Sequence, residues 1–253
     1  MYPKIFDIGS FSVYSYGFCI MLGVIFAYLY ISKTAKKELN IEPDKISEMI
    51  IYVLLASVIG GKFFLVLADL PQYLANPTEI FKDFGSGFVF YGSFIFAIPT
   101  LLWFFKKNEM PALKMLDIAA IGGTIVHGLG KIGCFMSGCC HGKVCDAAFG
   151  VVFSHPETNA EPINMPLYPV QLIDSIMILS IGALLLFLKR DKKFDGQLLL
   201  LYAILYGIGR FFTEFIRGDA GRGNIGPLSH SQFIGLIMAT IGSIIYLINK
   251  KKL

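Results

Sequence analysis

Charged residues are scarce in this 253-residue chain. Asp, Glu, Lys and Arg make up 16% of it, against about 25% in an average soluble domain. The net charge is only +4, and the cations fall in short clusters rather than in one basic stripe, which argues against a nucleic-acid-binding protein. The chain has no low-complexity tract and no internal repeat. Disorder is excluded as well, because 55% of the residues are hydrophobic and can bury a large apolar surface.

The chain contains many long runs of apolar residues. Seven runs approach the roughly 20 residues that cross a ~30 Å hydrocarbon layer, so we predict an all-α membrane protein with seven transmembrane helices. The first run lacks the basic start and the cleavage site of a signal peptide, and we expect it to be retained. No soluble domain interrupts the series, so we expect residues 1–253 to form a single polytopic membrane domain. The predicted spans cover residues 13–32, 48–68, 86–105, 112–133, 170–188, 197–216 and 231–248.

The cations are distributed unevenly over the predicted loops. Fourteen of the 22 Lys and Arg residues follow the first, third, fifth and seventh spans, whereas five lie on the opposite side. Because positive residues mark the cytoplasmic side, we expect the N-terminus outside and the C-terminus in the cytoplasm. The longest loop, about residues 134–169, then faces outward. The fourteen cations are Lys33, Lys36, Lys37, Lys45, Lys106, Lys107, Lys114, Lys189, Arg190, Lys192, Lys193, Lys250, Lys251 and Lys252.

Two predicted spans contain several ionisable side chains. A charge at bilayer depth costs roughly 2.5–3.5 kcal/mol or more unless it is paired or hydrated, so such residues indicate function. Within each span they recur three or four residues apart, which places them along one face of a helix. One stripe comprises His127, Lys131 and Cys134, and the other comprises Tyr206, Arg210, Glu214 and Arg217.

The cations in these stripes point to an anionic ligand. Lys131 and Arg210 near one membrane face suit a lipid headgroup, and Arg offers a fork that matches phosphate. Alternatively, Arg210 and Glu214 only neutralise each other on a buried helix. We predict a polar cavity open to the outer leaflet. Two acids, Asp117 and Asp174, lie near predicted helix starts, where the helix dipole favours them.

The segment from 134 to 145 holds four of the five cysteines. Together with His141 they could bind a metal, although their spacing is not a standard zinc pattern. In an outward loop they could instead form disulfides. A third alternative is a reactive thiolate whose pKa is lowered by Lys131, Lys143 or His141. The spacing leaves these alternatives open for Cys134, Cys139, Cys140 and Cys145.

A series of short motifs runs through most of the chain. The motifs are Ile5-Phe6-Asp7-Ile8-Gly9, Tyr14-Ser15-Tyr16-Gly17, Gly60-Gly61-Lys62, Phe90-Tyr91-Gly92, Gly128-Leu129-Gly130-Lys131-Ile132-Gly133 continuing to Gly142, Tyr168-Pro169-Val170-Gln171-Leu172, and Tyr206 to Arg217. Each motif is weak alone. In their order, spacing and number of spans, they together resemble the prolipoprotein diacylglyceryl transferases, a family of seven-span bacterial enzymes.

The resemblance implies a phospholipid-using transferase that acts at the outer leaflet of the bacterial plasma (inner) membrane. A lipobox cysteine of a preprotein would attack the glyceryl carbon of phosphatidylglycerol, and glycerol phosphate would leave. The product would be a diacylglyceryl thioether, a protein modification in lipoprotein biogenesis. The expected partners are therefore the phospholipid and the lipobox peptide, with no cofactor, no resident metal and no nucleic acid.

The resemblance also implies roles for individual residues. Arg210 is similar to an essential arginine of the family that stabilises the leaving phosphate, an electrostatic effect that can dominate catalysis. We expect Lys131 to help bind this phosphate, with His127 or His141 as the base. Cys139 and Cys140 complete the candidate catalytic group. The expected substrate-binding residues are Tyr16, Tyr91, Gly92, Cys134, Gly142, Glu214 and Arg217.

The chain departs from the family pattern at four positions. Lys131 stands where the family usually has Arg, which replaces a bidentate grip on phosphate with a point charge. Cys134 stands in place of Asn, Cys139 in place of Glu, and Tyr91 in place of His. These departures leave two alternatives open. One is a divergent paralogue with Cys139 or Cys140 as its own nucleophile or redox thiol, and the other is a metal- or thiol-handling membrane protein.

Overall fold

The computed structural model of the chain describes residues 2–8, 11–76, 90–218 and 223–251. The chain divides into two compact units. The larger unit comprises Met1–Ile31 with Leu116–Leu253, and the smaller comprises Ser32–Met115.

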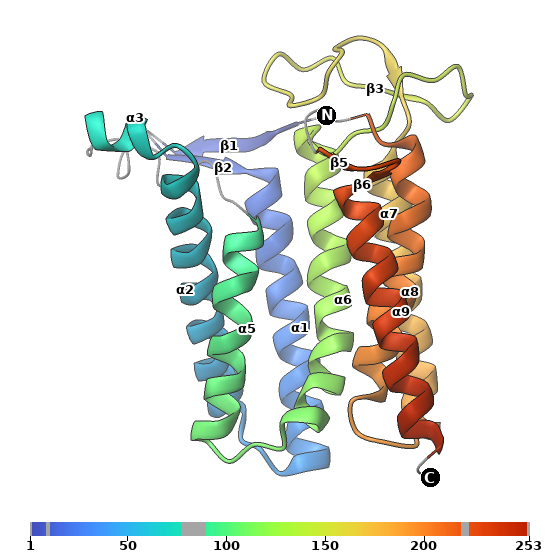
Figure 1. Cartoon of the computed structure of the whole chain (residues 1–253). Helices are drawn as coiled ribbons and strands as arrows, with labels where there is room; N and C mark the ends of the chain where they lie inside the picture. The colour runs from blue at the N-terminus through green and yellow to red at the C-terminus, as the bar shows by residue number, and fades with distance from the viewer. Residues whose placement is uncertain (1, 9–10, 77–89, 219–222, 252–253) are drawn as a thin grey trace. The chain divides into compact units, whose positions relative to one another are not determined.

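The larger unit is built on long helices (Figure 1). An antiparallel hairpin of β1 and β2 precedes the first helix, and the short 3-10 helices η1 and η2 follow α7 and α8. The helices are α1 (Ser15–Leu39), α6 (Ala112–Ser137), α7 (Val170–Leu188), η1 (Lys189–Asp191), α8 (Gln197–Thr213), η2 (Glu214–Ile216) and α9 (His230–Lys251). The strands, all in antiparallel pairs, are β1 (Lys4–Ile8) with β2 (Phe11–Tyr14), β3 (Val151–Val152) with β4 (Pro166–Leu167), and β5 (Asn224–Ile225) with β6 (Leu228–Ser229).

The smaller unit contains α2 (Pro43–Ala68), α3 (Leu70–Ala75) and α5 (Phe90–Lys107), together with the adjoining ends of α1 and α6. Helices α2 and α5 pack along each other and are in tight contact at two glycines. A Cβ atom on Gly92 would lie only 2.4 Å from the carbonyl oxygen of Gly60. The structure thus gives Gly92 a packing contact, and its expected role in binding substrate stays a prediction.

Each of the seven predicted spans falls on a helix. Among the described residues, 6 helices are long and apolar enough to cross a membrane, so the chain is a multi-pass membrane protein with helical spans. The third predicted span falls on α5, which is not one of the six, and residues 86–89 of that span lie outside the described residues. The count of seven spans and the orientation of the termini therefore stay predictions.

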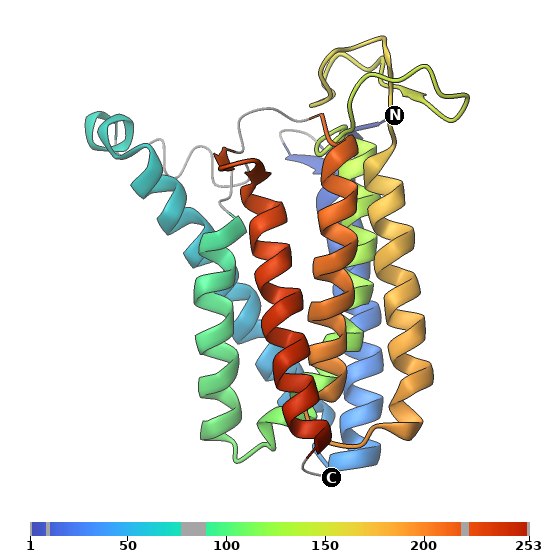
Figure 2. The ribbon, with the colours of Figure 1, turned by 45° about the vertical axis from the view of Figure 1, so that its right-hand side comes forward.

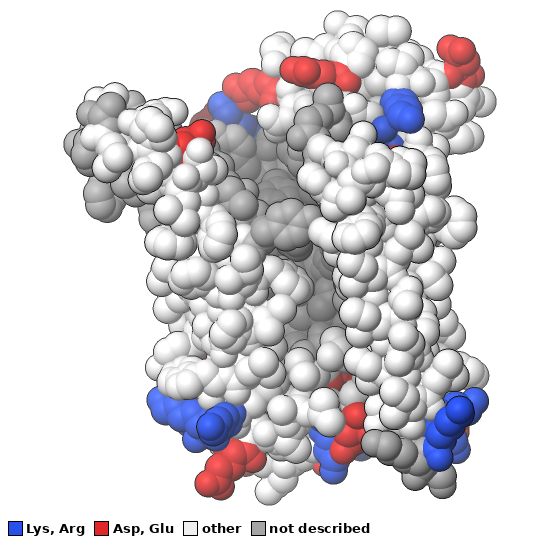
Figure 3. Space-filling model, in the orientation of Figure 1, with Lys and Arg blue, Asp and Glu red and all other residues white. Residues whose placement is uncertain are grey.

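Large apolar side chains are exposed along the helices of the larger unit. Ile176, Phe187 and Phe212 are 67%, 72% and 65% exposed. Figure 3 shows few charged side chains along the sides of the helices and clusters of them near the helix ends. An apolar surface this extensive is not typical of a monomeric soluble protein, and it matches the apolar solvent that a bilayer provides.

Small residues allow close helix packing inside the larger unit. Helices α8 and α9 run side by side in both ribbon views (Figure 2), and a Cβ atom on Gly207 would lie 2.5 Å from the carbonyl oxygen of Gly235. Such contacts stabilise membrane helices because lipid supplies no hydrophobic driving force between them. An apolar cluster connects three of the helices and comprises Ile121, Ile181, Leu185 and Leu198.

Asp117 of α6 caps the start of α8. Its side chain is almost fully buried, and its oxygens accept hydrogen bonds from the backbone N–H groups of Gly196 (2.9 Å), Leu198 (2.8 Å) and Leu199 (3.1 Å). The first N–H groups of a helix have no partner within the helix, so this carboxylate satisfies them from a neighbouring helix. Lys192 lies 3.0 Å from the same carboxylate. The sequence-based interpretation, in which Asp117 responds to the dipole of its own helix, misses this interaction.

We predict that Asp117→Ala lowers the thermal unfolding midpoint of the detergent-solubilised protein. The substitution leaves buried N–H groups of α8 without an acceptor, and each such group costs about 1–3 kcal/mol. Asp195→Ala is the matched control, because Asp195 also contacts Lys192 (3.1 Å) but is more exposed. Equal unfolding midpoints for the two variants would contradict the capping role.

Candidate functional site

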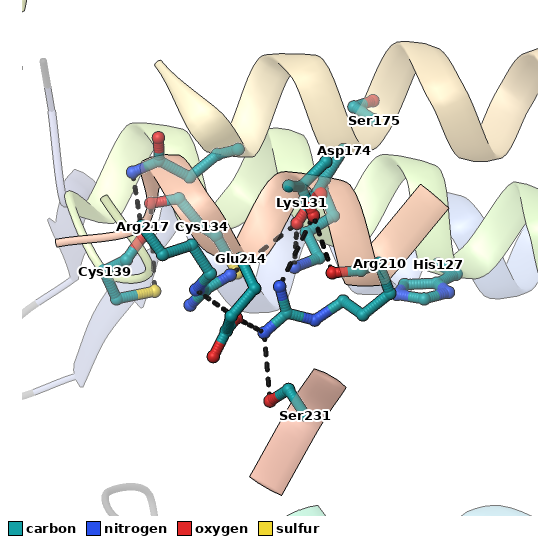
Figure 4. Close-up of polar contacts among 12 residues, drawn as sticks. His127, Lys131, Cys134, Cys139, Asp174, Ser175, Arg210, Glu214, Arg217 and Ser231 are labelled. Atoms are coloured by element: carbon teal, nitrogen blue, oxygen red, sulfur yellow. Dashed lines mark hydrogen bonds and ion pairs between the residues drawn. The ribbon is translucent and has the colours of Figure 1, made fainter. Parts of the chain in front are cut away.

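A buried carboxylate lies at the centre of the candidate site. Asp174 of α7 is fully buried, and its Oδ2 atom is 2.7 Å from Nζ of Lys131 on α6 and 3.7 Å from Nη1 of Arg217. These contacts are drawn in Figure 4. Asp174 thus joins α6, α7 and the segment that follows η2. The sequence-based interpretation of Asp174 as a residue favoured by the helix dipole is incomplete, because the carboxylate has specific cationic partners.

Arg210 and Glu214 form the second half of the site. Nη2 of Arg210 lies 2.5 Å from Oε2 of Glu214, and the same nitrogen donates to the hydroxyl of Ser231 on α9 at 3.2 Å. Glu214 also lies 3.8 Å from Nε of Arg217. The predicted neutralising pair of Arg210 and Glu214 is therefore present, but it belongs to a larger network that includes α9.

The ionic network has an excess of one positive charge. It contains three cations and two carboxylates, and the side chains of Arg210 and Arg217 are only 9% and 4% exposed. A buried charge is expensive unless it is paired, so an anion entering this site would complete the charge balance. Two carboxylate oxygens of the network, Oδ1 of Asp174 and Oε2 of Glu214, are buried without a hydrogen-bond partner among the described residues, although Oε2 of Glu214 takes part in ion pairs. The five members of the ionic network are Lys131, Asp174, Arg210, Glu214 and Arg217.

Gly142 holds the loop after α6 against Arg217. The two residues form an antiparallel bridge, and on the other side of the loop the N–H of Gly142 donates to the carbonyl of Tyr168 at 3.0 Å. A Cβ atom on Gly142 would lie 2.4 Å from Cβ and 2.5 Å from the carbonyl oxygen of Tyr168. A glycine is therefore required for the backbone to pass between its two neighbours, and this backbone in turn positions Arg217.

The two histidines that were predicted as bases have different hydrogen-bond partners in the structure. His141 is buried; its Nδ1 lies 3.0 Å from the carbonyl oxygen of Gly142, and its Nε2 accepts from the N–H of Glu161 at 3.3 Å. Both ring nitrogens thus bind backbone, which indicates a structural role in the loop. His127 instead lies on α6, one helical turn before Lys131 (Figure 4). Its Nδ1 is 2.8 Å from the hydroxyl of Tyr202, and its ring packs edge-on against Tyr206.

Three of the predicted cysteines come together just beyond α6. The Sγ atoms of Cys134, Cys139 and Cys140 all lie within 4.8 Å of one another. All five cysteines are in the described part of the chain, and none of them forms a disulfide there. Hydrogen bonds from the thiols of Cys134 and Cys139 lower the pKa of the Cys140 thiol, and the positive charges of Arg217 and Lys131 act in the same direction.

The other expected binding residues are placed less completely. Tyr16 is the second residue of α1 and lies where this helix meets α6, since a Cβ atom on Gly133 would be 3.0 Å from Cα of Tyr16. Tyr91 is in the first turn of α5, but its side chain lies outside the described residues. Like Gly92, it belongs to the smaller unit. The roles of Tyr16 and Tyr91 in binding substrate stay predictions.

We predict that Gly142→Ala destabilises the loop and lowers the thermal unfolding midpoint. The new methyl group would overlap the backbone of Tyr168, and overpacking typically costs about 1–3 kcal/mol. Gly123→Ala on α6 is the matched control, because a Cβ atom there meets nothing within 4 Å. Unfolding midpoints that are the same in both variants would contradict the steric role of Gly142.

Comparisons with known proteins agree with this geometry. The family model described as prolipoprotein diacylglyceryl transferase matches residues 3–248. A phosphatidylglycerol–prolipoprotein diacylglyceryl transferase of Clostridium tetani is 36% identical over 250 residues, which cover 99% of this chain and 98% of the relative. The enzyme of that name numbered 2 in Clostridium perfringens is 36% identical over 246 residues, covering 97% and 94%. The Wolbachia pipientis enzyme is 30% identical over 252 residues, again covering 97% and 94%.

These similarities extend over nearly the whole chain and are not confined to one motif. They confirm the resemblance inferred from the motifs and support the transferase hypothesis. They give no support to a thiol-nucleophile paralogue or a metal-handling protein as the main function. The chain belongs to the prolipoprotein diacylglyceryl transferase family.

Proposed function

We propose that this chain transfers the diacylglyceryl group of phosphatidylglycerol to the lipobox cysteine of a prolipoprotein. The names of its relatives contain both phosphatidylglycerol and prolipoprotein. The structural observation that supports this function most strongly is the ionic network, a buried cluster whose cations outnumber its carboxylates by one. Phosphatidylglycerol carries a single negative charge on its phosphate, which is the charge that this network lacks.

The cations of the ionic network have distinct tasks in this proposal. Arg210 presents the fork that suits two phosphate oxygens, while its contact with Glu214 fixes the guanidinium. Lys131 and Arg217 share Asp174. One carboxylate does not neutralise two cations, so both can still attract the phosphate of the lipid. Because the site is buried, these charges act through a low dielectric and are preorganised before the reaction begins.

The reaction needs a leaving group that departs with its electrons. The thiolate of the lipobox cysteine attacks the glyceryl carbon, forming the C–S bond as the C–O bond to phosphate breaks. The electron pair of the C–O bond goes to the phosphate oxygen, and glycerol phosphate leaves. Negative charge therefore grows on the phosphate during the reaction, and cations aimed at that oxygen stabilise the transition state more than the bound lipid.

The thiol of the incoming cysteine must lose its proton, and we assign this step to His127. The geometry sets one condition on the assignment. His127 can accept a proton on Nε2 only if its Nδ1–H donates to the hydroxyl of Tyr202, 2.8 Å away. The opposite direction of this bond would place the proton on Nε2 and leave no lone pair for the substrate. His141 is left out, since backbone groups engage both its nitrogens.

We further propose that the site opens to the outer leaflet of the bacterial plasma membrane. This orientation requires α5 to cross as a seventh span, with the N-terminus outside and the C-terminus in the cytoplasm. It is supported by the cation clusters near the C-terminal ends of α1, α5 and α9 and just after α7, which mark the cytoplasmic side. The loop between α6 and α7 would then face outward, and an inactive periplasmic reporter fused within that loop would contradict this topology.

We predict that Arg210→Ala reduces turnover by about 10²–10³-fold, the typical effect of removing one preorganised donor to a developing charge. The turnover of Arg210→Lys should lie between those of Arg210→Ala and the native protein, because an ammonium supplies charge without the bidentate fork. The assay uses the purified protein in phosphatidylglycerol vesicles with a lipobox peptide. Mass spectrometry detects the diacylglyceryl adduct on the peptide, and the released glycerol phosphate is measured in parallel.

Arg190→Ala is the matched control for this assay, because Arg190 is exposed in η1. Its turnover should equal that of the native chain. If the native chain forms no adduct, the transfer reaction is excluded for these substrates. A near-normal rate in Arg210→Ala would instead remove the arginine from the phosphate site.

A further inference from the structure

The transfer steps proposed above make no use of the three-thiol cluster of Cys134, Cys139 and Cys140, whose expected roles in catalysis and substrate binding stay predictions. Their Sγ atoms lie within 4.8 Å of one another, although only two of the residues are adjacent in sequence. Three sulfurs that each lie about 2.3 Å from a central ion are about 4 Å apart. The observed spacing therefore fits a single metal ion after a small inward movement of the side chains.

The backbone brings these sulfurs together through an unusual turn. Gly138 and Cys140 both have positive φ angles, 82° and 60°, and a non-glycine residue in this region is uncommon. The turn brings the chain back on itself after α6. Ser137, the last residue of α6, contacts the turn directly, since its hydroxyl oxygen lies 3.4 Å from Sγ of Cys139.

The ligand set determines which ion would fit. Within the described part of the chain, the cluster consists of three cysteines with no histidine or carboxylate at the same spacing. The nearby His141 is held by backbone groups on both nitrogens. Thiolates alone select soft ions such as copper(I) and zinc. Structural zinc almost always takes four protein ligands, whereas copper(I) also accepts a trigonal set of three sulfurs.

We propose that Cys134, Cys139 and Cys140 bind one copper(I) ion through three thiolates. Each thiol gives up its proton to solvent as its Cu–S bond forms, and the copper stays in the +1 state throughout. The complex carries two negative charges, and two cations near it, Lys131 and Arg217, are the ones that share Asp174. Lys131 lies three residues before Cys134 on α6, and Arg217 pairs with Gly142, two residues beyond Cys140. This site is additional to the proposed transfer reaction.

Copper(I) titration of the reduced, metal-free full-length protein in detergent tests this site. A chromophoric copper(I) chelator competes for the metal, so that its colour reports both stoichiometry and affinity. We expect one equivalent of copper per chain. Cys139→Ser should weaken binding by at least about 100-fold, because even the loss of an outer-shell partner weakens metal binding roughly 10–100-fold. X-ray absorption at the copper edge should show three sulfur neighbours.

Cys19→Ser is the matched control, because Cys19 lies outside the three-thiol cluster and its loss should leave the affinity unchanged. Cys134→Ser tests the buried ligand, and thermal unfolding confirms that each variant is folded. Less than one equivalent bound by the native chain would overturn the proposal, as would native affinity in folded Cys134→Ser and Cys139→Ser variants. A preference for zinc over copper(I) would also overturn the assignment. None of these readouts depends on diacylglyceryl transfer, so the two proposals fail separately.

Discussion

The candidate site depends on one buried carboxylate shared by two cations. Asp174 is fully buried, with Lys131 at 2.7 Å and Arg217 at 3.7 Å. Without these partners the carboxylate would face a large desolvation penalty, and without it the two cations would repel each other in a low dielectric. The interaction joins two helices to the segment after η2. Its geometry therefore decides where the remaining charges of the site can lie.

Other parts of the larger unit hold this arrangement in place. Gly142 lets the loop after α6 pair with Arg217, while the hydroxyl of Ser231 ties Arg210 to α9. At the other end of α6, the carboxylate of Asp117 caps α8, the helix that carries Arg210. A cation placed in this way from several helices loses little freedom when it binds phosphate, and this preorganisation is the main source of electrostatic catalysis.

The sequence predicted the helices well, because a span of about 20 apolar residues has few alternatives. It also placed His127, Lys131 and Arg210 on helical stripes, because residues three or four positions apart lie on the same face of a helix. It did not predict the partners of Asp117 and Asp174, which come from other helices about 80 and 43 residues away along the chain. Nor did it predict the structural role of His141, because the hydrogen bonds of its ring are made to backbone groups of the loop. Helix periodicity carries no information about such contacts.

The central claim is that the ionic network holds the phosphate of an anionic lipid. Native mass spectrometry of the protein released from nanodiscs with equal amounts of phosphatidylglycerol and phosphatidylethanolamine measures this directly. The account predicts that the native chain retains phosphatidylglycerol in preference to the zwitterionic lipid, and that folded Arg210→Ala loses the preference. Equal retention of both lipids by the native chain, or an unchanged preference in the variant, would contradict it.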